Sequence, residues 1–219
     1  MINQKTQDLV SATGMTILFI CVIQCTMAIL PGTGLWTQAA TGSATLTAVA
    51  LYVRYRARLD GLGSADLGLH LTAGGLTLGA ITGFVERPLE QPLLDYLCRG
   101  ITATEWELLR ARTPFPVLSH PSTFIASLLS ILFAAAAEEL FFRGYLVARL
   151  RRTFGATSVL ILSSALFAAS HCLPLRLYPY YFLGGLIYGA LRLATGSPWP
   201  ALIAHTVCNL MAAWTASLS

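Results

Sequence analysis

The sequence has few charged side chains. Only 11% of its 219 residues are Asp, Glu, Lys or Arg, whereas 55% are hydrophobic, and an ordinary soluble domain carries roughly 25% charged residues. Residues 9–53, 67–85 and 113–137 contain no charge at all. Each of these stretches reaches the roughly 20 residues that cross the hydrocarbon core of a bilayer. This lack of charge argues against a soluble domain and predicts a chain embedded in a membrane.

Lysine and paired cysteines are also scarce. A single Lys accompanies thirteen Arg, against ten acids. The basic residues occur in short clusters between apolar runs, a pattern typical of membrane orientation that argues against nucleic acid as a partner. The five cysteines are odd in number and four lie in apolar runs, so we do not expect a disulfide framework.

Seven apolar segments predict an all-α membrane helix bundle of about seven transmembrane helices, formed by a single domain over residues 1–219. Pro and Gly supply the breaks, since Pro lacks an amide donor and Gly tolerates turn dihedrals. The loops on the side of the N-terminus hold eight Lys and Arg and the opposite loops hold five. This bias predicts a cytoplasmic N-terminus, and we expect the plasma membrane as the location. The predicted spans are residues 10–30, 36–53, 67–85, 122–147, 157–173, 178–191 and 199–218.

The segment between the third and fourth predicted spans, residues 86–121, mixes charges with Leu and Trp side chains. Since the charges begin at Glu86, the third span is expected to end at Val85. Two interpretations of the segment stay open. It could be a helix on the membrane surface that guides a substrate, or a solvated loop with one amphipathic turn.

Two acids and a base lie inside the otherwise apolar fourth span. Insertion scales assign about 2.5 to 3.5 kcal/mol to each ionised residue at such a position. Glu139 and Arg143 are four residues apart and share a helical face, so we expect them to pair. A purely structural ion pair would explain these two equally well. Glu138 is rotated by about 100° from Glu139 and is free to face another group.

Two later spans contribute imidazole and carboxamide groups. His171 ends the fifth span one turn after Phe167, and His205 lies one turn before Asn209 in the seventh. Residues four apart project from one face of a helix. Asn209 adds a donor and an acceptor where Leu would pack better, and intramembrane ionisable groups are functional by default. The polar site expected from these spans consists of Glu138, His171, His205 and Asn209.

The three motifs together resemble those of a known family. Glu138-Glu139-xxx-Arg143, Phe167-xxx-His171 and His205-xxx-Asn209, in this order on successive late helices, are similar to the motifs of the CAAX prenyl endopeptidase and bacteriocin-processing (ABI) membrane proteins. The resemblance covers residues 122–219. It implies a glutamic-type intramembrane protease without a cofactor, which cuts a membrane-associated protein or peptide. Prenylated CAAX tails, bacteriocin leaders and sorting-signal tails are all substrates that the resemblance admits.

The residues permit hydrolysis by an activated water. A carboxylate in a low-dielectric pocket with a His beside it is a competent general base, so Glu138, assisted by His171, is expected to activate the water. His205 and the Asn209 amide would donate hydrogen bonds to the developing oxyanion. The resemblance implies the same roles. Three residues are expected to support the site and hold its helices in register: Glu139, Arg143 and Phe167.

Other interpretations use the same polar residues. The His and Glu side chains could instead hold Zn²⁺ with a bound water, although the His-Glu-x-x-His signature is absent and Asn is a poor zinc ligand. Cysteine catalysis would use Cys172 or Cys208, each rotated by about 100° from the neighbouring His171 or Asn209. A transporter or an idle immunity scaffold would also bury such groups. We rank these alternatives below the metal-free peptidase.

Overall fold

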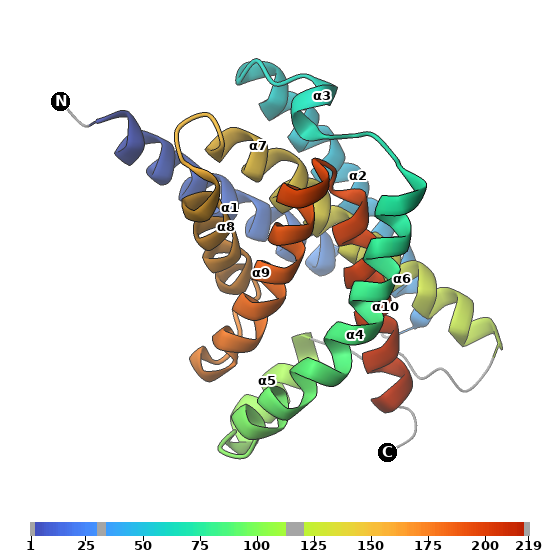
Figure 1. Cartoon of the computed structure of the whole chain (residues 1–219). Helices are drawn as coiled ribbons and strands as arrows, with labels where there is room; N and C mark the ends of the chain where they lie inside the picture. The colour runs from blue at the N-terminus through green and yellow to red at the C-terminus, as the bar shows by residue number, and fades with distance from the viewer. Residues whose placement is uncertain (1–2, 30–33, 113–120, 217–219) are drawn as a thin grey trace.

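The computed structural model describes residues 3–29, 34–112 and 121–216, and within these ranges it is helical without a single strand (Figure 1). Seven long helical segments in this part of the chain correspond one to one to the seven predicted spans. The all-α bundle of about seven helices is therefore confirmed. The long segments are α1 (Gln4–Ile29), α2 (Leu35–Leu59), α4 (Ala73–Cys98), α6 (Pro121–Glu139) with its continuation, α8 (Ala156–Ser170), α9 (Tyr178–Thr195) and α10 (Trp199–Ala216).

The fourth long segment changes its winding at the centre of the molecule. After α6 the chain continues through a π-helical turn, η1 (Leu140–Leu146), into α7 (Val147–Leu150). The Val147 amide donates to the Phe142 carbonyl, five residues back. Every residue of η1 after the first is buried. π-Helical turns are rare and frequent at functional sites, and η1 carries Arg143.

Large apolar side chains point outward around the bundle. Ile17 is 57% exposed, Leu51 64% and Ile81 56%. Contiguous exposed apolar surface of this kind marks contact with a membrane or a partner. In addition, Gln4–Ile23 and Phe124–Leu150 are long and apolar enough to cross a membrane. The outward-facing side chains and these two segments fit a bundle surrounded by lipid.

The third predicted span was misplaced. It was expected over residues 67–85, but α4 begins at Ala73, where the Thr72 hydroxyl caps it by accepting from the Gly75 amide at 3.1 Å. The helix then runs on to Cys98 and includes Pro88 and Pro92. The segment from Glu86, for which a surface helix and a solvated loop were both open, is thus a continuation of the third long helix for its first thirteen residues. The remaining elements are α3 (Ser64–Leu67), α5 (Ala103–Arg112) and the short 3-10 turn η2 (Leu175–Leu177).

Glycines let α4 lie directly against α10, and the two helices run side by side in Figure 1. Gly75, Gly79 and Gly83 recur every fourth residue on one face of α4. A Cβ added at Gly83 would come within 2.5 Å of the Ala204 carbonyl oxygen. Small residues at this spacing allow helix backbones to approach closely in membranes. The contact brings the residues that follow Gly83 beside the second half of α10.

Candidate active site

The centre of the site is a buried ion pair on the fourth long segment. Arg143 Nη1 donates to Glu139 Oε1 at 3.0 Å, and both side chains are 1% exposed. Arg143 Nη2 also donates to the Gly185 carbonyl of α9 at 3.1 Å. The pairing expected from the four-residue spacing is therefore present. It joins η1 to α9 as well as neutralising Glu139.

His205 of α10 shares the same carboxylate oxygen. Its Nδ1 lies 2.9 Å from Glu139 Oε1, and the Tyr188 ring stacks on the imidazole with centroids 4.8 Å apart. Because a carboxylate paired with Arg143 can only accept, Nδ1 carries a proton. The other ring nitrogen, Nε2, is left for a different partner.

His171 lies at the end of α8 and is oriented by its own helix. Its Nδ1 lies 2.9 Å from the Phe167 carbonyl oxygen. A carbonyl accepts hydrogen bonds only, so Nδ1 is again the protonated nitrogen and the Nε2 lone pair is free. The Tyr181 ring, on α9, covers the imidazole with centroids 4.0 Å apart.

Phe167 connects the two imidazoles to the ion pair. The Arg143 guanidinium lies 4.3 Å from the centroid of its ring, a cation–π contact. The ring centroids of His171 and His205 lie 4.8 and 6.0 Å from that of Phe167. This side chain is therefore in contact with the other site residues, beyond the core packing that a lone Phe indicates.

Glu138 and Asn209 complete the expected set. Glu138 is half-buried, and its Oε2 is shielded from solvent without a hydrogen-bond partner in the described ranges. Asn209 is half-buried one turn after His205, and no hydrogen bond in the described residues joins it to the others. Direct contacts thus link Glu139, Arg143, Phe167, His171 and His205, whereas no hydrogen bond or ion pair in the described residues joins Glu138 or Asn209 to them.

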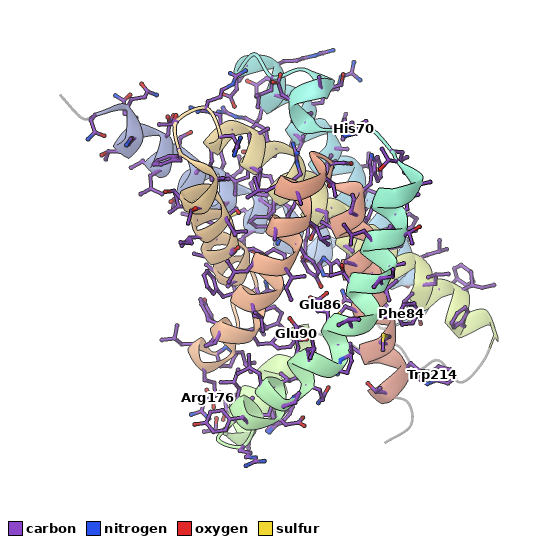
Figure 2. The ribbon with its side chains drawn as sticks, viewed as in Figure 1. His70, Phe84, Glu86, Glu90, Arg176 and Trp214 are labelled. Carbon is purple, nitrogen blue, oxygen red and sulfur yellow. The ribbon has the colours of Figure 1, made fainter. Side chains whose placement is uncertain are left out.

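The structure also reveals polar residues that the sequence prediction missed. Glu86 and Glu90, on the unexpected continuation of α4, are each 2% exposed, and Figure 2 shows both on the side of α4 toward α9. Among the described residues, Glu86, Glu90 and Cys208 form a group of potential metal ligands. One ligand atom from each of the three lies within 4.8 Å of those of the other two. No three of the described His and Glu side chains considered above for zinc bring their ligand atoms within this distance of one another. The regular glycine spacing in α4 was a signal that could have predicted the burial.

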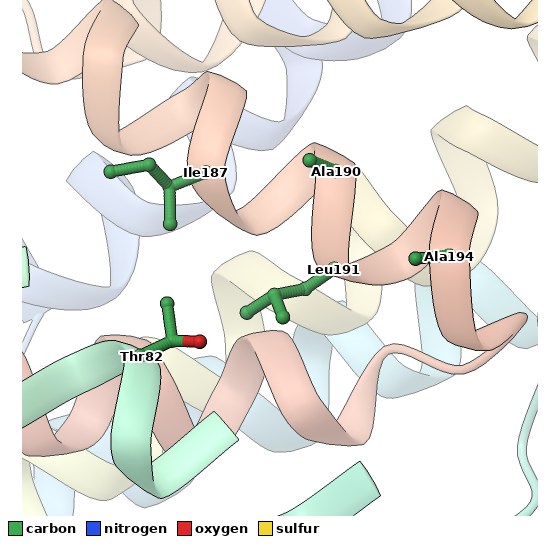
Figure 3. Close-up of a pocket in the computed structure, with 5 residues that line it drawn as sticks. All are labelled: Thr82, Ile187, Ala190, Leu191 and Ala194. Carbon is green, nitrogen blue, oxygen red and sulfur yellow. The ribbon is translucent and has the colours of Figure 1, made fainter. Parts of the chain in front are cut away.

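A pocket lies elsewhere, between α4 and α9. It has a volume of about 340 Å³ and is lined by Thr82, Ile187, Ala190, Leu191 and Ala194, which Figure 3 shows around the gap between the two helices. Its lining is apolar apart from one hydroxyl. None of the candidate catalytic residues lines this pocket, so it is not the candidate active site.

Comparison with known families agrees with the motifs. Residues 120–211 match the family model described as type II CAAX prenyl endopeptidase Rce1-like. The matched range contains all three motifs, from Glu138 to Asn209. No curated protein and no solved structure matches the chain.

Proposed function

Since residues 120–211 match the Rce1-like family of type II CAAX prenyl endopeptidases, we propose that the chain is a member of this family and a glutamic-type intramembrane endopeptidase. Its substrate would be a membrane-associated protein or peptide, and its hydrolytic step would use no metal. The observation that carries the proposal is the arrangement of the two imidazoles. Each has its Nδ1 held by a protein oxygen, which leaves its Nε2 for a water or a substrate.

The first step is activation of a water by Glu138 and His171. The unpartnered Glu138 oxygen accepts the proton while the His171 Nε2 lone pair holds the water in place. A positioned general base of this kind contributes about 10²–10⁴-fold to a rate. The oxygen of the water then bonds to the scissile carbonyl carbon, and the protonated Glu138 returns its proton to the departing amine.

The second element is stabilisation of the oxyanion by His205 and Asn209. With Nδ1 held by Glu139, a second proton on His205 Nε2 makes that nitrogen a donor, and the Glu139 carboxylate compensates the resulting charge. The Asn209 amide is a second donor one turn away on α10. Preorganised donors of this type supply about 10²–10³-fold in acyl transfer.

The substrate class follows from the family description. A peptide with a prenylated CAAX tail is the first substrate to test, because the matched model describes CAAX prenyl endopeptidases. Bacteriocin leaders and sorting-signal tails are the next candidates. An apolar anchor on any of these would keep the scissile bond at the membrane, where the site residues are buried.

The orientation that we propose has the N-terminus in the cytoplasm. Arg149 pairs with Asp8 near the start of α1 and with Asp60 at the end of α2. The start of α1, the end of α2 and the end of α7 therefore lie at the same end of the bundle. This grouping supports the predicted topology, in which the loops richer in Arg face the cytoplasm of the cell.

The deciding experiment compares native protein with Glu138→Gln in proteoliposomes containing a prenylated CAAX peptide. The native chain should cleave the peptide, and the variant should lose about 10²–10⁴-fold in kcat/KM because Gln cannot take the proton. Asp95→Asn, at an exposed position on α4, is the matched control and should cleave normally. Cleavage by Glu138→Gln at the native rate would exclude the mechanism, and ion flux without cleavage would favour a transporter.

A further inference from the structure

Two carboxylates lie deep in the bundle without a counter-charge. Glu86 and Glu90 are one turn apart on α4, and each is 2% exposed. Both oxygens of Glu86 and Oε1 of Glu90 are buried and accept no well-formed hydrogen bond in the described part of the chain, although the Tyr188 and Tyr180 hydroxyls lie near Glu86 and Glu90. Buried charges are normally paired or coordinate a metal, because an isolated ion is costly to remove from water. Two such groups side by side need compensation.

The adjacent base does not supply it. Arg87 lies between the two acids in sequence, but its Nη1 faces the Tyr180 hydroxyl at 3.5 Å and its Nε has no partner. Among the described residues, neither Glu86 nor Glu90 belongs to an ion pair within 4.0 Å. Compensation must therefore come either from protons on the two carboxyl groups or from a bound cation.

A third potential ligand adjoins the two acids. Cys208 of α10 is 3% exposed, and its sulfur and one oxygen of each acid all lie within 4.8 Å of one another. Gly184 of α9 lies over the carboxylates, since a Cβ added there would be in van der Waals contact, at 3.6 Å, with Oε1 of both Glu86 and Glu90. Two oxygens and one sulfur thus converge from α4 and α10 under α9.

We propose that Glu86, Glu90 and Cys208 form a binding site for a thiophilic divalent cation of the zinc class. Mg²⁺ and Ca²⁺ prefer all-oxygen ligands, whereas Zn²⁺ accepts carboxylate and thiolate together. With Zn–O near 2.1 Å and Zn–S near 2.3 Å, tetrahedral ligand atoms are roughly 3.5 Å apart. The three side chains need to close by only about 1 Å. Binding releases the thiol proton, and the cation offsets two of the three negative charges of its ligands.

The cation would have a structural role. Cys208 lies three residues after His205, and Tyr188 stacks on that imidazole. The bound cation would fasten α4 to the segment of α10 that carries His205 and Asn209. It would not hold the attacking water, and its binding does not depend on whether the chain is a peptidase.

The test is cobalt titration of the purified full chain in detergent after chelator treatment. Cobalt bound to a thiolate absorbs in the near ultraviolet, so one equivalent of Co²⁺ should produce a saturable band that Zn²⁺ then removes. Cys208→Ala should abolish the band. Cys21→Ala, which removes an exposed thiol of α1, is the matched control and should keep it.

The two acids are tested in the same titration. The double variant Glu86→Gln, Glu90→Gln should bind Co²⁺ at least tenfold more weakly than the native chain. The native titration needs no variant to fold and can overturn the proposal by itself. Absence of a saturable thiolate band, or a band that survives Cys208→Ala, would show that the two carboxyl groups are accommodated without a metal, for example by sharing a proton.

Discussion

Two pairs of glutamates, Glu138 with Glu139 and Glu86 with Glu90, lie inside the bundle, and only the first pair contains an acid that has a counter-charge among the described residues. On α6, Glu139 is 1% exposed and has Arg143 at 3.0 Å and His205 at 2.9 Å. On α4, Glu86 and Glu90 are 2% exposed and have no ion-pair partner among the described residues. The comparison shows that burial alone does not identify the role of an acid. The identity of the compensating group does.

The spacing within each pair explains part of the difference. Adjacent residues diverge by about 100° around a helix, so Glu139 can be neutralised while Glu138 points to another side of the helix. Residues four apart project to the same side, so Glu86 and Glu90 converge on one point. Divergent acids suit a division between supporting and reacting groups. Convergent acids suit the joint binding of a cation.

The largest expected effect comes from breaking the ion pair between Glu139 and Arg143. Arg143→Leu should destabilise the protein by about 3–5 kcal/mol, because removing one partner leaves a buried charge unpaired. Arg151→Leu, an exposed position just after α7, should change stability by less than about 0.5 kcal/mol. The measurement is the free energy of unfolding in detergent. Equal stability of the two variants would mean that Glu139 does not need its counter-charge.

The burial and pairing of Glu139 could be predicted from the sequence, whereas the burial of Glu86 and Glu90 could not. Three ionisable residues interrupt an apolar run at Glu138, Glu139 and Arg143, so hydropathy and four-residue spacing together predict both burial and pairing. The seven helices follow from the charge-free stretches in the same way. A change of local winding has no such signal, and the π-helical turn at η1 was not predicted.

The burial of Glu86 and Glu90 was missed because the apolar stretch ends at Val85, whereas the helix continues to Cys98. Charges begin at Glu86, and Pro88 and Pro92 normally signal a break. The burial of Glu86 comes from α9 and α10, which lie about a hundred residues away in sequence. Only the repeat of Gly75, Gly79 and Gly83 indicates locally that another helix approaches this face.

A smaller effect is expected from disturbing the contact that brings the uncompensated pair to α10. Gly83→Ala places a Cβ 2.5 Å from the Ala204 carbonyl oxygen, and overpacking of this kind costs about 1–3 kcal/mol. Gly74→Ala on the same helix meets nothing within 4 Å and should be neutral or stabilising. The thermal unfolding midpoint in detergent separates the two. If both variants melt alike, the glycine repeat does not determine the approach of α4 to α10.

The smallest effect is expected from neutralising Glu86, and the sign of the change in stability tests whether this acid binds a cation. In chelator, Glu86→Gln should leave the protein as stable as the native chain or raise the free energy of unfolding by about 1 kcal/mol, because it removes an unpaired buried charge. With excess Zn²⁺ the native chain should become the more stable of the two, since a ligand that binds only the folded state stabilises it. Glu139→Gln, which removes the negative charge that pairs with Arg143 and His205, should be destabilising in both conditions. If Glu86→Gln were equally destabilised with and without zinc, Glu86 would be stabilised by protein groups alone, as Glu139 is, and not by a bound cation.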